Sequence, residues 1–427
     1  MTGVVEHALD EYRNHVRQWT AQHLSLRSQD TGRHALGDLA DVDVEAAKKI
    51  QQKIFNAGFI GITLPTEYGG AGLTAAHERI WYEESSKYAV PIPRGVATLV
   101  TLGIILPTVL AHGSEEQKRD WIPKMLSGDD AWVQLLSEPS AGSDLAGLRT
   151  RATRDGDSWV LNGAKVWSSG ADRADFGICL ARTDWDVPKH QGLTWFKVPL
   201  DDDRITVRPI REINGSAAFC EEFLDDIVVG ADMVIGAVNG GWAVANALLA
   251  YERAGGSGGA HGIRGGAEGT LGAARVDRLA PDLVALAEEG NLTHDRAARQ
   301  LIARAHINDY MQHQLAERVM ETMRTGKANA AAASLLKLGI GVVNPVRAQI
   351  AMELAGRRGI AWEADAPGAG AALDYLNGRV MSIGGGSDQI QRNIISERLL
   401  GLPREPSFDT DKPFRDVLLD AKNWGQA

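Results

Sequence analysis

Residues 131–182 carry the most informative pattern in the chain: AWVQLLSEPSAGSDLAGLRTRATRDGDSWVLNGAKVWSSGADRADFGICLAR. Short runs of β-branched, aromatic and aliphatic residues alternate with polar ones, which is typical of strands. Asp155-Gly156-Asp157 and Asn162-Gly163 separate these runs, and both are turn sequences that connect antiparallel neighbours. The stretch therefore predicts an antiparallel meander with one turn at each place.

The loop SEPSAGSD, at residues 137–144, lies inside this β-structure. Pro139 fixes the local backbone and removes one N–H donor. The other small polar residues can present hydroxyl groups and free backbone N–H groups to a ligand. We therefore expect a loop that binds a ligand.

Helical periodicity flanks the β-structure on both sides. Apolar residues recur at helical spacing in six ranges, 4–25, 42–57, 75–112, 114–129, 294–327 and 330–357. Further strands are predicted at 192–200, 205–210 and 220–229. The chain thus divides into a helical part (1–130), a β part (131–232), a second helical part (233–407) and a tail (408–427).

Composition bounds the class of protein. With 427 residues, 44% of them hydrophobic, the chain is long enough for two or three domains with a large core. Its net charge of -10 argues against broad nucleic-acid binding. No glycine-rich dinucleotide fingerprint lies between a predicted strand and helix, which disfavours a nicotinamide enzyme of the Rossmann type. No metal site is predicted.

The sequence also bears on cellular location. The N-terminus lacks the basic and apolar regions of a signal peptide, and no apolar run is long enough to span a membrane. Cys179 and Cys220 are expected to be free thiols in a reducing compartment, with a disulfide as the alternative. We therefore expect a cytoplasmic protein.

Three segments resemble signatures of the acyl-CoA dehydrogenase family, in the family's order and spacing: SEPSAGSD, LNGAKVWSSG (161–170) and QIQRNIISERLLGLPREP (389–406). The resemblance covers residues 40–405. It implies a multidomain α+β fold with an N-terminal α-helical domain, a middle β-barrel and a C-terminal four-helix bundle. It also implies FAD as cofactor and an acyl-CoA or acyl-carrier-protein thioester as substrate. The implied partners are a separate electron-transfer protein and further subunits, in a homotetramer or an α2β2 heterotetramer.

The catalytic base departs from the commonest pattern of the family. Most members place a Glu just before the QIQR segment, where this chain has Gly385, and glycine takes no proton. The isovaleryl- and long-chain-type branch places its base on the helix after the β-domain, directly before an Arg, and the matching residue is Glu252, before Arg253. The apolar neighbours of Glu252 favour a raised pKa. The alternative is a surface carboxylate in an ordinary ion pair, with Asp388 as the next candidate base.

The resemblance also assigns the other site residues. It places Leu136 and Ser137 at the flavin ring edge, Ser143 at the pyrophosphate, and Trp167 with Ser169 against the isoalloxazine. The C-terminal segment adds Ser387 and Gln389 as cofactor contacts, and Arg253, Gly385 and Gly386 are assigned to the substrate. An indole offers a flat apolar face to a tricyclic ring. A Trp buried in the core is the alternative for Trp167.

Two motifs of the family are altered. Arg278 matches the Arg of its Arg-x-x-Phe-Gly segment, but Pro281 replaces the Phe. Gly356 matches its Gln-x-x-Gly-Gly-x-Gly segment, where Arg357 and Arg358 are added charges that could pair with phosphate or with a surface carboxylate. These losses resemble the heterotetrameric branch, in which a partner subunit completes the flavin site.

The favoured function is FAD-dependent α,β-dehydrogenation of an acyl-CoA. One rival is a flavin oxidase or monooxygenase on the same scaffold. Another is a non-catalytic or half-site subunit that stabilises a catalytic partner, which the glycine at 385 supports and Glu252 opposes. The acyl group is not readable from the sequence, although the glycines at 384–386 permit a wide pocket.

Overall fold

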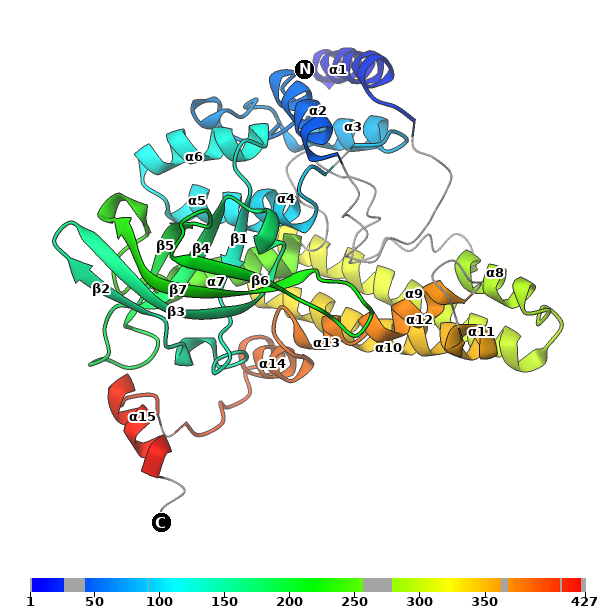
Figure 1. The fold of residues 1–427 in the computed structure, drawn as a ribbon. Helices are drawn as coiled ribbons and strands as arrows, with labels where there is room; N and C mark the ends of the chain where they lie inside the picture. The colour runs from blue at the N-terminus through cyan, green and yellow to red at the C-terminus, as the bar shows by residue number, and fades with distance from the viewer. Residues whose placement is uncertain are drawn as a thin grey trace.

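A computed structural model describes residues 2–26, 43–90, 92–255, 279–361, 368–407 and 409–423 of the chain. Helices of the N-terminal part lie above a twisted sheet, and the C-terminal helices extend to one side of it (Figure 1). The order of helices, strands and helices confirms the predicted fold class.

The N-terminal helices follow the predicted ranges closely. Their bounds are α1 (Thr2–His23), α2 (Val44–Asn56), α3 (Ala75–Ser85), α4 (Val96–Val100), α5 (Leu106–His112) and α6 (Glu115–Ser127). At the start of α6, Ser114 and Gln117 form a capping box, in which the Gln117 N–H donates to the Ser114 hydroxyl (3.2 Å). Local sequence signals therefore set the ends of this helix.

The middle part forms an eight-stranded sheet in the order β6-β7-β3-β2-β4-β5-β8, with β1 beside β4. The strands are β1 (Trp132–Leu135), β2 (Arg151–Asp155), β3 (Ser158–Ser169), β4 (Phe176–Arg182), β5 (Leu193–Pro199), β6 (Ile205–Ile210), β7 (Phe219–Gly230) and β8 (Val234–Ile235). One core lies within the curved sheet, and Cys179 and Cys220 are buried and unpaired there. The expectation of free thiols is confirmed.

One predicted turn is wrong. The β2–β3 hairpin turns after Asp155, as expected, but β3 continues through Asn162 and Gly163 without reversing. There the pairing with β7 shifts, and the Asn162 amide donates to Asp226 on that strand (2.9 Å). A Cβ on Gly163 would lie 2.4 Å from the Thr150 hydroxyl, so the glycine permits a bulge against a crowded neighbour.

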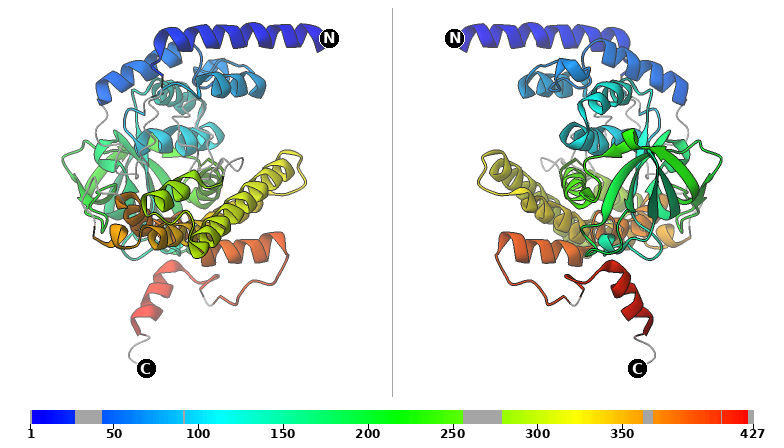
Figure 2. Two further views of the ribbon diagram at one scale, coloured as in Figure 1. Left: turned by 90° about the vertical axis from the view of Figure 1, so that its right-hand side faces the viewer. Right: turned by 90° about the vertical axis from the view of Figure 1, so that its left-hand side faces the viewer.

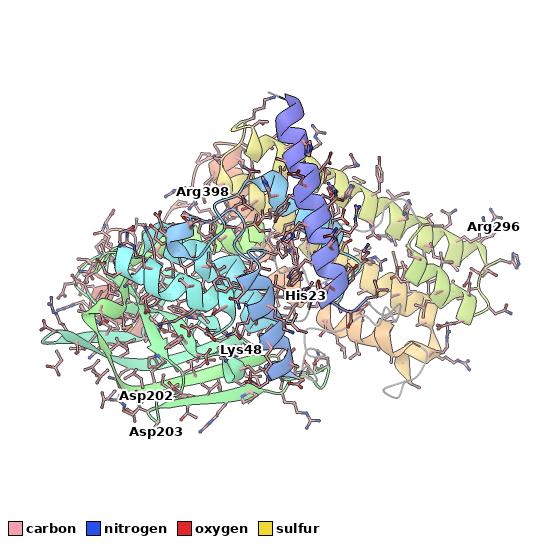
Figure 3. The ribbon with its side chains drawn as sticks, turned by 90° about the horizontal axis from the view of Figure 1, so that it is seen from above. His23, Lys48, Asp202, Asp203, Arg296 and Arg398 are labelled. Atoms are coloured by element: carbon pink, nitrogen blue, oxygen red, sulfur yellow. The ribbon has the colours of Figure 1, made fainter. Side chains whose placement is uncertain are left out.

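The C-terminal part is built around two long helices. Its elements are α7 (Gly241–Gly255), α8 (Pro281–Glu289), α9 (Arg296–Arg324), α10 (Ala333–Ala355), α11 (Arg357–Ile360), α12 (Ala369–Asn377), α13 (Val380–Ile383) and α14 (Asp388–Ile394). Helix α10 packs against α9 and the short helices that follow it. Arg296, at the start of α9, lies far from Asp202 and Asp203 of the sheet (Figure 3), so the long helices project away from it. Within the described residues, no helix has the length and apolar character of a membrane span.

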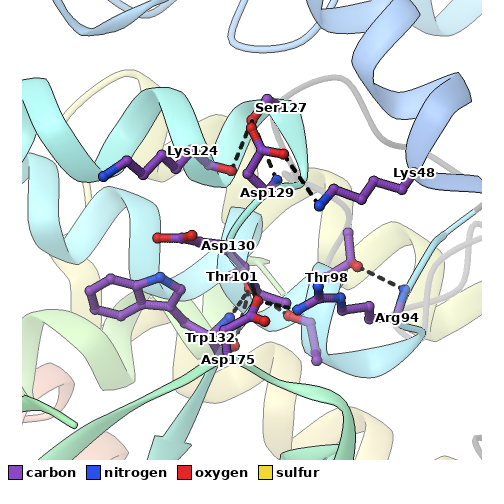
Figure 4. Close-up of polar contacts among 12 residues, drawn as sticks. Lys48, Arg94, Thr98, Thr101, Lys124, Ser127, Asp129, Asp130, Trp132 and Asp175 are labelled. Carbon is purple, nitrogen blue, oxygen red and sulfur yellow. Dashed lines mark hydrogen bonds and ion pairs between the residues drawn. The ribbon is translucent and has the colours of Figure 1, made fainter. Parts of the chain in front are cut away.

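A polar junction joins the N-terminal helices to the sheet (Figure 4). The Thr101 hydroxyl accepts a hydrogen bond from the Trp132 N–H (2.7 Å) and donates to the Ala97 carbonyl (2.7 Å). Arg94 pairs with Asp175, whose carboxylate also accepts from the Ala131 N–H (2.7 Å). These bonds fix the start of β1, which leads into the SEPSAGSD loop.

The last helix lies apart from the C-terminal bundle. Helix α15 (Phe414–Asn423) sits below the sheet near the C-terminus, while α1 lies at the opposite end of the molecule (Figures 1 and 2). The tail therefore folds onto the β part.

Candidate functional site

Helix α7 carries Glu252 to the edge of the sheet. The Trp195 indole N–H donates to the Gly241 carbonyl (2.8 Å) and fixes the start of the helix against β5. Val244 and Leu248 are buried in the core shared by the N-terminal helices and the sheet. Because Glu252 follows at the same four-residue spacing, its side chain lies on this inward face. There the Gln134 amide of β1 donates to its carboxylate (3.4 Å).

The glycine loop before α14 closes over this carboxylate. Gly385 has a φ of 65°, and a Cβ added to it would lie 2.8 Å from Glu252 Oε1. The side chain of Gln391 is buried, and its amide donates to the carbonyls of Gly385 (2.9 Å) and Gly386 (3.1 Å). The Glu252 carboxylate therefore occupies the space in front of position 385, where a side chain would otherwise begin.

The surroundings of Glu252 favour a proton acceptor of raised pKa. Burial raises the pKa of Glu252, and the Gln134 hydrogen bond and the charges of Arg253 and Lys337 oppose this rise without cancelling it. Burial in turn lowers the pKa of both cations. Lys337 is 5% exposed and donates to the Met381 carbonyl. Glu252 is half-buried, and its carboxylate accepts a hydrogen bond from the Gln134 amide. Both observations argue against the alternative of a surface carboxylate in an ordinary ion pair.

A buried ion pair shapes the SEPSAGSD loop. Lys165 of β3 is fully buried and donates to Glu138 (2.9 Å), to the Leu136 carbonyl (3.1 Å) and to the Leu180 carbonyl (2.7 Å). Glu138 also accepts from the N–H groups of Arg149 (2.6 Å) and Thr150 (2.8 Å). The loop is thereby fixed to the strand that bears Trp167.

Trp167 stands out from this strand. Its φ is 68°, which is rare for a bulky residue, and the pairing of β3 with β7 shifts beside it. Its side chain is 58% exposed, which contradicts the alternative of a Trp buried in the core. The neighbouring Val166 N–H donates to the Ser137 carbonyl (2.9 Å), so the loop and the indole are adjacent. An exposed flat ring beside a fixed polar loop fits a flavin.

A buried carboxyl supports the same bulge. The Ser168 hydroxyl donates to Glu222 of β7 (2.9 Å), and burial raises the pKa of Glu222 to about 7. Strand β7 thus holds β3 next to the strained residue. No hydrogen-bond partner is found for the other oxygen of Glu222 within the part of the chain that the structure describes.

Four further predicted residues lie in two parts of the chain. Ser387 caps α14 by accepting from the Ile390 N–H (3.3 Å), next to Gln389 and the glycine loop. Ser143 lies exposed in the SEPSAGSD loop, and Ser169 is half-buried at the end of β3. Ser387 and Gln389 thus stand next to the glycine loop that approaches Glu252, whereas Ser143 and Ser169 lie in the loop and strand beside Trp167.

Two predicted residues are not brought to this site. Gly356 lies between α10 and α11, at the end of the bundle distant from the sheet (Figure 1). Nearby, Arg358 forms an ion pair with Glu289 (3.2 Å). Of the two partners expected for this arginine, a phosphate or a carboxylate, the structure shows the carboxylate. Arg278 lies outside the described residues.

Three site residues were missed in the sequence. Gln134 interrupts the apolar strand WVQL, and Lys337 interrupts the apolar start of α10. Both are isolated polar residues in buried elements, a pattern that often marks a paired or functional group. Gln391 lies inside a recognised segment, but its bonds to the glycine carbonyls depend on the folded loop.

Models of one protein family match almost the whole chain. They are the N-terminal domain of acyl-CoA dehydrogenase at residues 7–129, the middle domain at 134–227 and the C-terminal domain at 239–400.

Named relatives agree with these matches. The acyl-CoA dehydrogenase IpdE1 of Mycobacterium tuberculosis is 35% identical over 93% of this chain and 98% of its own length. The acyl-CoA dehydrogenase FadE34 of the same organism is 37% identical over 86% of this chain, which spans about half (48%) of that longer protein. Among solved structures, the Tcur3481-Tcur3483 steroid ACAD superposes with a TM-score of 0.71 at 26% identity, over 93% of this chain and 98% of that one. The ChsE4-ChsE5 complex of M. tuberculosis gives 0.66 at 25% identity, over 93% and 98%.

Proposed function

Because the chain belongs to the acyl-CoA dehydrogenase family, we propose that it catalyses FAD-dependent α,β-dehydrogenation of an acyl-CoA thioester, with Glu252 as the base. The family comprises flavin-dependent oxidoreductases that act on acyl-CoA. The observation that carries the proposal is the approach of Glu252 to Gly385: a half-buried carboxylate fills the space in front of a backbone that has no base of its own.

Each side chain has a role in this reaction. Glu252 removes the α-proton, and its raised pKa makes its carboxylate a stronger base than an exposed one. Gln134 orients the carboxylate, and the charges of Arg253 and Lys337 oppose the rise of its pKa. Arg253 and the backbone of Gly385 and Gly386 line the acyl side.

The flavin would be held by the loop and the bulged strand. Leu136, Ser137 and Ser143 would contact it from the SEPSAGSD loop, and Trp167 with Ser169 would cover the ring. Ser387 and Gln389 would contact it from the start of α14. When bound, FAD accepts the β-hydride and passes the electrons to a separate acceptor.

We propose a bulky acyl group as substrate. The space in front of Gly385 is taken by Glu252 and that in front of Gly386 by Gln391, so these glycines do not themselves open a wide pocket. A solved relative bears the name steroid ACAD, and this likeness supports a polycyclic acyl chain.

We further propose that the chain works in a tetramer with a second copy or a homologous chain. Ile307, Tyr310 and Met311 of α9 and Val342 of α10 are exposed apolar side chains on the projecting helices. Two structural neighbours are named as pairs of chains. The buried free thiols agree with a reducing compartment, and the cytoplasm is the proposed location.

An absorption spectrum of the purified protein, followed by anaerobic addition of acyl-CoA thioesters, tests the function. Bound flavin that is bleached by a thioester supports it, and fast reoxidation by O2 would instead support an oxidase. A colourless protein that gains flavin only with a second homologous chain would support the half-site subunit.

A further inference from the structure

The C-terminal tail packs against the end of β4 and the β4–β5 loop. Strand β2 pairs with β4 only at Arg151 and Arg182, beside this contact. Phe414 of α15 is 2% exposed, and its N–H donates to the Val187 carbonyl (3.0 Å). The buried Arg182 guanidinium lies 3.8 Å from the centre of its ring. Residues around Phe414 are thus part of the folded molecule.

A pocket of about 560 Å³ lies between this helix, β2 and the β4–β5 loop. Its lining contains Arg151, Arg154 and Arg415, and it contains no carboxylate. Arg415 pairs with Asp186 outside the lining, and Arg151 lies 5.2 Å from the centre of the Trp185 ring. Within the described ranges, neither Arg151 nor Arg154 has a carboxylate partner.

We propose that this pocket binds a phosphate-bearing group. Guanidinium groups match phosphate oxygens with paired, charge-assisted hydrogen bonds. Asp186 competes for Arg415, whereas Arg151 and Arg154 have no carboxylate partner within the described ranges. The proposed function supplies one such group, the nucleotide end of the CoA thioester, and the assignment to this source rests on that function. A free nucleotide is the other source of the same chemistry.

The pocket lies within reach of the site. On β4, Ile178 pairs with Gln134, which bonds to Glu252, and Arg182 pairs with Arg151 of the pocket four residues later. At the rise of a strand this is roughly 13 Å along the sheet. The pantetheine arm of CoA separates its phosphates from its thioester, so a bound ester has to span such an interval.

A contact chain joins the tail to the flavin loop. The Lys189 ammonium pairs with Asp144 of the SEPSAGSD loop (3.0 Å) and with Asp409 of the tail (2.7 Å). Lys189 therefore links the SEPSAGSD loop to the segment that precedes α15, the helix that carries Arg415 of the pocket.

The test uses Arg154→Gln and the double variant Arg151→Gln/Arg154→Gln in the full-length holoprotein. Arg154 is exposed, and its Nε donates only to the Gly156 carbonyl (3.1 Å), so its loss leaves the fold intact. Arg119→Gln is the matched control, because Arg119 forms an exposed ion pair with Glu115 on α6. Steady-state kinetics compare an acyl-CoA with the acyl-pantetheine that lacks the nucleotide. Calorimetry measures binding of pyrophosphate and of the adenosine bisphosphate fragment of CoA.

We expect the double variant to raise KM for the acyl-CoA by about tenfold, which corresponds to about 1.4 kcal/mol, with kcat and the KM for acyl-pantetheine unchanged. If the double variant binds the fragments more weakly but keeps its KM for acyl-CoA, the pocket is a phosphate site whose ligand is a free nucleotide. Unchanged fragment binding and unchanged KM would overturn the proposal. If the wild type oxidises no thioester, the proposed function fails, while calorimetry still decides whether the pocket binds phosphate.

Discussion

The missing side chain at Gly385 leaves space that the Glu252 carboxylate occupies. Glu252 Oε1 lies 2.8 Å from the place of a Cβ at this position, and the φ of 65° favours glycine. Gly385 thus leaves room for a base that comes from another helix. The two positions are linked, because a side chain at 385 would displace the Glu252 carboxylate from its present place.

Gly385→Ala should therefore displace the Glu252 carboxylate. We expect kcat to fall on the order of 10²-fold, the effect of misplacing a reacting group by about 1 Å. Gly384→Ala is the matched control, since its Cβ would lie 3.4 Å from the Val380 carbonyl, an ordinary contact. Equal kcat values for Gly385→Ala and Gly384→Ala would show that a side chain at position 385 does not displace the Glu252 carboxylate.

Lys337 sets the pH range of the same carboxylate. Its positive charge lowers the pKa of Glu252 against the larger effect of burial. Lys337→Met should raise that pKa further, and because the base acts when deprotonated, the acid limb of the kcat–pH profile should move to higher pH. Lys337→Arg, which keeps the charge, should leave the limb near its wild-type position. A limb that does not move with Lys337→Met would separate this lysine from the base.

At the scale of elements, one buried ion pair joins the SEPSAGSD loop to β3. Burial alone would raise the pKa of Glu138, but Lys165 and the N–H groups of Thr150 and Arg149 outweigh it, and the pKa is lowered. The carboxylate therefore stabilises the fold at neutral pH. That contribution is lost as the pH falls through the lowered pKa.

Lys165→Met should leave the buried Glu138 without its cation. Removal of one partner of a buried pair costs about 3–5 kcal/mol, so we expect a lower thermal midpoint and loss of flavin. Glu138→Gln/Lys165→Met should recover much of the midpoint. Lys124→Met, at an exposed pair with Asp120, is the control and should change little. A midpoint that is unchanged by Lys165→Met would show that the pair does not stabilise the loop.

Helices were easier to predict than the path of β3. The ends of α6 follow from its capping box and from Gly128 after it, which are local signals. Asn162-Gly163 has the composition of a turn, yet its asparagine bonds to Asp226, 64 residues away. Tertiary pairing overrode the local preference there. The same holds for Trp167, whose exposure depends on a bulge against β7.

At the scale of the whole molecule, the site combines segments that are distant in sequence. Gln134 and Glu252 are separated by 118 positions and meet through one hydrogen bond. Resemblance to a family located Glu252 and Gly385, but no local pattern places Lys337 beside them. Only the packing of α10 against the glycine loop does so.

The projecting helices test the proposed assembly. Ile307→Glu and Met311→Glu place charges on the exposed apolar face of α9, and we expect a smaller species in analytical ultracentrifugation because the charges would be buried against a partner. Val228→Glu, at an exposed apolar residue of β7, is the control and should keep the wild-type mass. A wild-type protein that sediments as a monomer would contradict the assembly.

Glu252→Gln removes the proposed base while keeping its size. In anaerobic stopped-flow experiments with the holoprotein and a thioester that the wild type oxidises, we expect flavin to stay bound and its reduction to slow by roughly 10²–10⁴-fold, the usual contribution of a positioned base. Flavin reduction by Glu252→Gln at the wild-type rate would show that Glu252 is not the base, and Asp388 would be the next residue to change.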